Sequence, residues 1–156
     1  MRTRFAVLVL ALLAVSAGLA AADDPLVGNW KLNPAKSKFS PLPAPQDITI
    51  KYEPVGADGI KVTAEITDAK GKKTVTAYSG RTDGKDVPVT GSADADTCSM
   101  KRIDANTTEV ANKKAGKATT ALKRAVSKDG KTLTITAKGT DGQGQPVNSV
   151  EVFDKQ

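Results

Sequence analysis

The sequence contains no histidine, a single cysteine and few aromatic residues, and after residue 22 it contains only three arginines. Without histidine, a Ser-His-Asp triad, a Cys-His pair and a His-ligated zinc site are all excluded. The lone thiol, Cys98, can form neither an internal disulfide nor an all-cysteine metal or iron–sulfur site. Most familiar enzyme chemistries are thereby excluded for a chain of 156 residues, a length that suits one domain.

The first 22 residues are typical of a cleaved export signal. Arg2 and Arg4 give a basic start, residues 5–15 are an uninterrupted apolar run of 11 residues, and Ala20 to Ala22 supply small side chains for signal peptidase. The run is shorter than the roughly 20 residues that a membrane-spanning helix needs. We therefore predict that this segment is removed and that the protein is exported to a bacterial periplasm or secreted. The remainder, residues 23–156, is predicted to form one domain without a stable membrane span.

The basic charge of the chain comes from dispersed lysine. Residues 23–156 carry a net charge of +4 and include 18 lysines. Proteins that read nucleic acid favour bidentate arginine and stacked aromatic side chains, whereas dispersed lysine more often keeps a sheet soluble and protects its edges. We therefore predict no nucleic-acid partner.

Segments with a period of two alternate with turn signals from residue 27 onward. In residues 60–66 apolar and polar side chains alternate, and pairs such as Asp58-Gly59 supply the positive φ that tight hairpin turns require. Short turns predict antiparallel neighbours, and closure removes the edges of such a sheet. We expect an all-β, antiparallel up-and-down barrel of about eight to ten strands. The predicted strands are residues 27–32, 47–53, 59–67, 73–80, 86–90, 96–103, 107–113, 117–127, 131–138 and 147–154.

One long connection, residues 33–46, interrupts this pattern. Its four prolines exclude a continuous strand. Asn33 is a good helix cap, and Pro34 suits the first helical position, so a short helix is predicted within residues 34–39. We expect the connection to flank one mouth of the barrel.

The most specific motif is the Gly-x-Trp sequence of Gly28 and Trp30. The glycine permits close backbone approach, and the tryptophan, in the first predicted strand, can plug one end of a barrel. This opening resembles that of the calycin superfamily, which includes lipocalins and fatty-acid-binding proteins. Residues 118–131 resemble the eighth and ninth strands of fatty-acid-binding proteins, and residues 150–155 resemble their last strand. The opening through residues 36–39 also resembles that of small exported bacterial lipocalin-like proteins of unknown function.

The resemblance implies a calycin-like barrel that binds a small apolar or amphipathic ligand without catalysis. In fatty-acid-binding proteins the eighth strand supplies an inward arginine that holds the ligand carboxylate, and this position matches Arg124. Strand parity agrees independently, because Leu122, Arg124 and Val126 share a face. The chain departs from the family in its last strand, where the second arginine and the tyrosine fall at Glu151 and Phe153.

A second arginine, Arg102, shares a face with Cys98 and Met100 and is also predicted to point inward. A buried guanidinium must be paired or bind an anion, because an unpaired buried charge is costly. Two interpretations follow. One is a carboxylate or phosphate site inside the barrel, and the other is an internal salt bridge, for example between Arg124 and Glu151, that fills the lumen.

Other polar residues give weaker signals. Cys98 on an apolar strand face is typical of a small buried hydrophobe rather than a reactive thiol. The acidic residues Asp94, Asp96 and Asp104 lack the spacing of a calcium loop, so no metal and no cofactor are predicted. Tyr52 lies on the face of Ile48 and Ile50, which favours a core role over a ligand contact.

The sequence thus predicts an exported, non-enzymatic barrel that binds a small hydrophobic or carboxylate-bearing ligand. A filled barrel that acts through its surface, as an interaction or inhibitor module, is the first alternative. An enzyme is the second, and its acid–base chemistry would fall to carboxylates or lysines that show no recognisable pairing. The candidate ligand-binding residues are Arg124, Arg102, Trp30, Tyr52 and Phe153.

Overall fold

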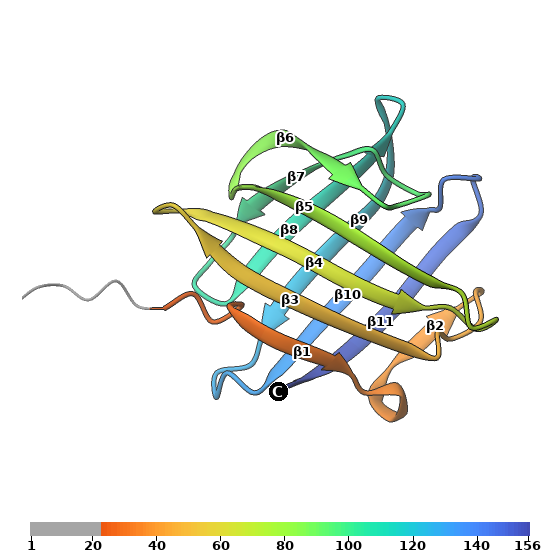
Figure 1. Ribbon diagram of the computed structural model, residues 1–156, viewed down its shortest axis with the longest axis horizontal. Helices are drawn as coiled ribbons and strands as arrows, with labels where there is room; N and C mark the ends of the chain where they lie inside the picture. The colour runs from red at the N-terminus through yellow and green to blue at the C-terminus, as the bar shows by residue number, and fades with distance from the viewer. Residues whose placement is uncertain (1–22) are drawn as a thin grey trace, which may run out of the picture.

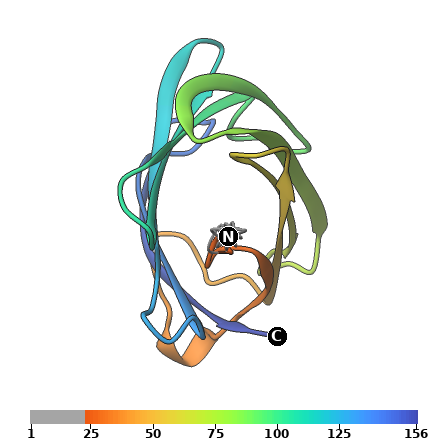
Figure 2. The same cartoon turned by 90° about the vertical axis from the view of Figure 1, so that its left-hand side faces the viewer.

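Ten strands of alternating side chains pair in chain order and close into a ring in the computed structural model, which describes residues 23–156 (Figures 1 and 2). Each ladder is antiparallel, and β11 returns to pair with β1, so the sheet has no open edge in the ring. The predicted signal lies outside the described residues. The strands of the ring are β1 (Gly28–Leu32), β3 (Asp47–Val55), β4 (Gly59–Thr67), β5 (Lys73–Arg81), β6 (Asp83–Thr90), β7 (Thr97–Arg102), β8 (Thr107–Lys114), β9 (Lys117–Val126), β10 (Thr132–Thr140) and β11 (Pro146–Lys155).

The all-β barrel predicted from the alternation is confirmed, and every predicted strand is present. The ladder between β5 and β6 is the shortest in the wall. It pairs only Ala77 with Thr90 and Tyr78 with Val89. The wall is therefore held together by few backbone hydrogen bonds beside Tyr78.

The connection after β1 contains one short helix and one short strand. The helix η1 (Pro34–Lys36) is a 3-10 turn that Asn33 caps, its side chain accepting from the Lys36 N–H at 3.2 Å. The predicted helix is wrong beyond Lys36, because the chain there forms β2 (Lys38–Ser40) along the first half of β11.

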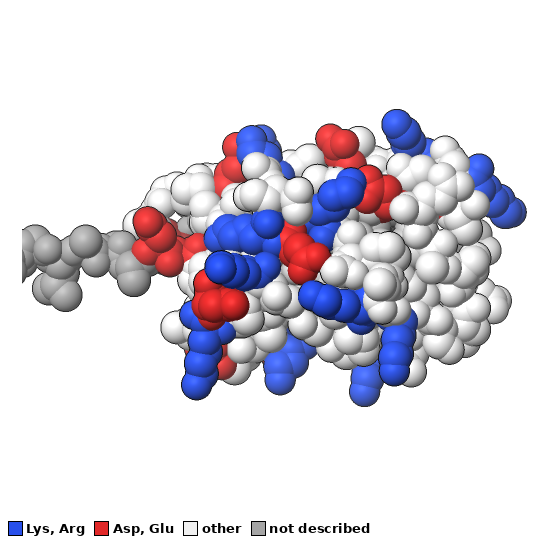
Figure 3. All heavy atoms as spheres, turned by 90° about the horizontal axis from the view of Figure 1, so that it is seen from below, with Lys and Arg blue, Asp and Glu red and all other residues white. Residues whose placement is uncertain are grey.

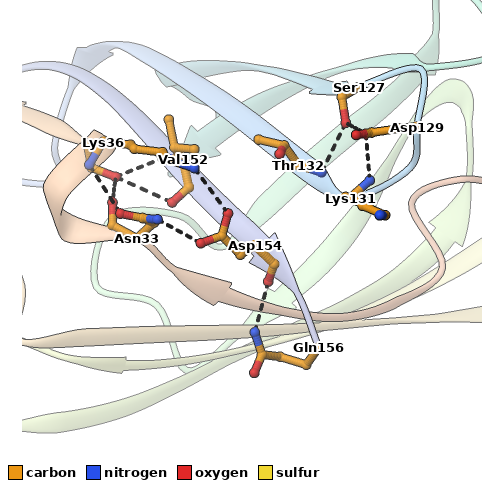
Figure 4. A network of polar contacts seen from close by, with 10 residues as sticks. Asn33, Lys36, Ser127, Asp129, Lys131, Thr132, Val152, Asp154 and Gln156 are labelled. Carbon is orange, nitrogen blue, oxygen red and sulfur yellow. Dashed lines mark hydrogen bonds and ion pairs between the residues drawn. The ribbon is translucent and has the colours of Figure 1, made fainter.

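Hydrogen bonds between this connection and β11 explain the extended backbone (Figure 4). The backbone N–H of Val152 donates to the Ser37 hydroxyl at 2.9 Å, and the backbone N–H of Asn33 donates to the Val152 carbonyl at 2.7 Å. The Asn33 amide also donates to Asp154 at 2.7 Å. These bonds replace the continuation of the helix and fix the connection to the barrel wall.

One half of the barrel interior is filled with side chains. Trp30, Met100, Leu133 and Phe153 are fully buried there and belong to one hydrophobic core. The Trp30 indole donates to the Leu26 carbonyl at 2.8 Å, so the segment before β1 covers this end of the barrel. This is the closed end.

Gly28 allows this end to close tightly. Its φ is +133°, and a Cβ built on it would lie 2.8 Å from Cε of Lys155. The ammonium of Lys155 in turn lies 5.1 Å from the centre of the Trp30 ring. The Lys155 side chain therefore lies close to the Gly28 backbone.

Charges of both signs are mixed on the outer surface, as Figure 3 shows for one face. Exposed pairs such as Lys31 with Asp47 at 3.0 Å and Lys113 with Asp86 at 2.7 Å accompany the dispersed lysines. Pairs of this kind contribute little stability. Within residues 23–156, no helix has the length and apolar character needed to cross a membrane.

Candidate functional site

The other half of the barrel interior holds a cavity of about 290 Å³. Inward side chains of β3, β4, β9 and β10 make its apolar wall, and Leu42 of the Pro-rich connection lies at its mouth. Ile60 and Leu133, which the alternation also places inward, belong to the buried core and not to the cavity lining. The apolar wall includes Ile48, Ile50, Val62, Ile66, Leu122 and Ile135.

Arg124 of β9 is the cation of this cavity. Its side chain reaches across the lumen to tyrosines of β3 and β5, where its guanidinium carbon lies 5.3 Å from the ring centre of Tyr52 and 5.7 Å from that of Tyr78. The guanidinium donates a hydrogen bond to the Tyr78 hydroxyl. Both contacts favour the charged form, since cation–π attraction and charge-assisted hydrogen bonds strengthen away from water.

The polar atoms of Arg124 are not saturated by these contacts. Only 3% of the residue is exposed, yet its Nε and Nη1 atoms have no hydrogen-bond partner within residues 23–156. The buried Tyr52 hydroxyl also lacks a partner there. An arginine keeps its charge in proteins, and burial raises the pKa of Tyr52, so the phenol stays neutral. Arg124 therefore has buried N–H donors, and Tyr52 a buried neutral hydroxyl, that no group in residues 23–156 satisfies.

Glu151 of β11 lines the same cavity but does not neutralise Arg124. Ile135 pairs with Arg124 on one side and with Glu151 on the other, so the two charged residues stand two strands apart. Neither is in an ion pair within the described part of the chain. The Ser149 hydroxyl donates to Glu151 at 2.9 Å, and burial raises the pKa of this carboxyl. The internal salt bridge considered from the sequence is absent.

Of the five candidate residues, the structure brings two to the cavity. Arg124 and Tyr52 line it. Trp30 and Phe153 are fully buried in the filled half of the barrel. Arg102 points toward the closed end, where it forms an ion pair with Asp24.

Cys98 is buried within the wall, as its apolar strand face predicts. Burial raises the pKa of its thiol to about 11. Because the thiolate is the reactive form, this cysteine is a packing residue. The acidic residues Asp94, Asp96 and Asp104 do not form a metal-binding group, and none is found among residues 23–156.

Tyr78 is a residue of the site that was not predicted from the sequence. The inward face of β5 carries Thr74 and Thr76 before it, so the strand has no apolar stripe that would point to the lumen. Strand parity was the available signal, because Tyr78 lies on the same face of the strand as those threonines. Its role as the hydrogen-bond partner of Arg124 depends on the ring closure that brings β5 opposite β9.

Comparison with known proteins supports the fold. No protein-family model and no curated protein matches the sequence. Among solved structures, the wild-type fluorescent protein UnaG is similar, with a TM-score of 0.54 and 16% identity over 83% of this chain and 96% of UnaG. A zebrafish ileal bile acid-binding protein complexed with cholic acid has a TM-score of 0.51 and 10% identity over 85% of this chain and 99% of that protein. At such identities the likeness shows the fold alone, a closed antiparallel β-barrel.

Proposed function

We propose that the protein is an exported, non-enzymatic binding protein for a small amphipathic acid, which enters the barrel and places its carboxylate on Arg124. The observation that carries the proposal is a buried guanidinium with two unpartnered nitrogens, Nε and Nη1, on the wall of an apolar cavity. An unpaired buried charge is costly. An anionic ligand would offset that cost, and the apolar wall would receive the rest of the molecule.

The neighbouring groups suit an acid. The Tyr52 hydroxyl has no hydrogen-bond partner within residues 23–156, and the ring that carries it contacts Arg124. A carboxylate bound there would accept charge-assisted hydrogen bonds, which are stronger than neutral ones. One of the similar solved structures contains cholic acid, an acid with an apolar body, which is consistent with this class of ligand.

The size of the cavity limits the ligand. A volume of about 290 Å³ corresponds to roughly ten water molecules at about 30 Å³ each. It lies at the lower end of known ligand pockets, which hold about 300–1,000 Å³. We therefore propose a compact acid, of medium chain length or with a single ring, rather than a long-chain lipid. The filled-barrel alternative is disfavoured because this space exceeds that of a few waters.

Native mass spectrometry tests the proposal on protein expressed with residues 1–22 and isolated from the periplasm of a bacterial host. The expected result is a mass matching residues 23–156 together with an adduct of a small acid. The adduct should disappear in Arg124→Met and persist in Arg81→Met, a matched control because Arg81 is exposed on the outside of the barrel. A bare mass in the wild type, with no uptake of added octanoate or phenylpropionate, would contradict the binding function. An uncleaved protein that stays in the cytoplasm would contradict export alone.

A further inference from the structure

Two charged side chains of opposite sign line one cavity without contacting each other. Arg124 and Glu151 both belong to the lining. Their strands are separated by β10, so their backbones are roughly 10 Å apart at about 4.8 Å per strand, and within residues 23–156 no ion pair joins them. The two groups are therefore available to two different parts of one ligand.

Glu151 has spare capacity to accept hydrogen bonds. An ionised carboxylate has about four acceptor positions, and the Ser149 hydroxyl occupies one of them. No lysine or arginine is within ion-pair distance of Glu151 in the described chain. Its apolar neighbours, such as Ile135, offer no hydrogen bond to the carboxyl oxygens.

We propose that the ligand carries, besides its carboxylate, a hydrogen-bond donor such as a hydroxyl or an amine, and that Glu151 is the residue that selects for it. The inference rests on the proposed function and specifies its substrate class as a hydroxy acid or an amino acid with an apolar body. Arg124 holds the acid end, and Glu151 accepts from the donor end. A ligand with two acidic ends is disfavoured, because its second carboxylate would meet Glu151.

The sign of the effect makes the inference testable. Burying a hydroxyl without a partner is unfavourable, so an apolar cavity should bind octanoate better than ω-hydroxyoctanoate. With Glu151 as acceptor, the order is reversed. Removal of the acceptor should restore the preference for the plain acid.

The experiment is a calorimetric titration of the protein with octanoate, ω-hydroxyoctanoate and ω-aminooctanoate. The wild type is expected to bind the two donor-bearing acids at least about tenfold more tightly than octanoate, a difference that hydrogen bonds to charged groups can supply. Glu151→Leu should bind octanoate best. Glu151→Gln keeps an acceptor oxygen but loses the charge, so it should retain the hydroxyl preference in part and lose the amine preference.

The outcomes separate this inference from the function on which it rests. If octanoate binds the wild type as well as or better than the donor-bearing acids, or if Glu151→Leu keeps the same order, Glu151 does not select the ligand and the inference is overturned. If none of the three acids binds the wild type, the proposed acid-binding function fails with it. Because the folded state of each variant is verified by circular dichroism before titration, a loss of fold is not counted as a loss of binding.

Discussion

Arg124 and Tyr78 come from nearly opposite sides of the barrel and are joined by the one side-chain hydrogen bond that the guanidinium makes within residues 23–156. The ring of Tyr52 also contacts this guanidinium, but its hydroxyl has no partner in the described part of the chain. The rings of both tyrosines thus lie close to the cation, but only the Tyr78 hydroxyl is hydrogen-bonded to it.

This difference predicts unequal effects of removing the two hydroxyls. Tyr78→Phe should lower the free energy of unfolding by about 1–3 kcal/mol, because it leaves a buried charged donor without its partner. Tyr52→Phe should leave the free energy unchanged or raise it slightly, because its hydroxyl is buried without a hydrogen bond. Urea unfolding of both variants measures the contrast, and equal losses would show that the hydrogen bond is not the distinguishing feature.

The absence of an ion pair predicts how stability responds to loss of the charge. Breaking a buried salt bridge typically costs about 3–5 kcal/mol, whereas Arg124 has no carboxylate partner to abandon. Arg124→Met keeps much of the side-chain length. It should therefore either raise the free energy of unfolding or lower it by at most about 1 kcal/mol. Urea unfolding of this variant beside the exposed Arg81→Met checks the prediction. A loss comparable to that of a broken salt bridge would favour a purely structural role.

Glu151 predicts a pH dependence of stability. Burial raises the pKa of this carboxyl above its ordinary value of 4.5, so the folded protein binds the proton more tightly than the unfolded chain does. The stability that this tighter proton binding gives the folded state is fully present at a pH below the ordinary pKa of the carboxyl, and it is lost as the pH rises through the raised pKa. Glu151→Gln should therefore be more stable than the wild type near neutral pH and should lose that advantage in acid. Unfolding curves across this range test the sign, and an advantage that grows in acid would contradict it.

The closed end of the barrel should affect stability but not ligand binding. Asp24 accepts from the Leu26 N–H at 2.9 Å and pairs with Arg102, on the far side of the filled core from the cavity. Asp24→Ala should lower the free energy of unfolding by about 1–3 kcal/mol, because it leaves a partly buried guanidinium without its carboxylate. Titration with octanoate should give the wild-type affinity. A weakened affinity would show that the two ends of the barrel are coupled.

Most of the fold follows from local patterns in the sequence. The alternation in residues such as Ile60 to Ile66 predicts both the strand and the face that it buries, and Asp-Gly turns predict its neighbours. The strand β2 was not predicted because three residues are too few for a periodic signal. Its extended backbone depends on Ser37, whose partner Val152 lies 115 positions away in the sequence.

The site could be predicted only in part. Parity on β9 places Arg124 inward from the sequence alone, and the structure agrees. Strand parity does not indicate where along the lumen the packed core ends and the cavity begins. Trp30 and Phe153 were therefore predicted as ligand-binding residues together with Arg124. The partnership with Tyr78 and the separation from Glu151 depend on the closure of the ring and on side-chain direction, which no local pattern specifies.

The most direct test of the account is the affinity of octanoate for the wild type, Arg124→Met and Arg81→Met, measured by isothermal titration calorimetry. Saturable binding to the wild type and to Arg81→Met is expected. Arg124→Met should bind octanoate about tenfold to a hundredfold more weakly, the range expected for hydrogen bonds to a charged group. Equal affinity in all three proteins, or no binding to any of them, would contradict the claim that Arg124 is a carboxylate site.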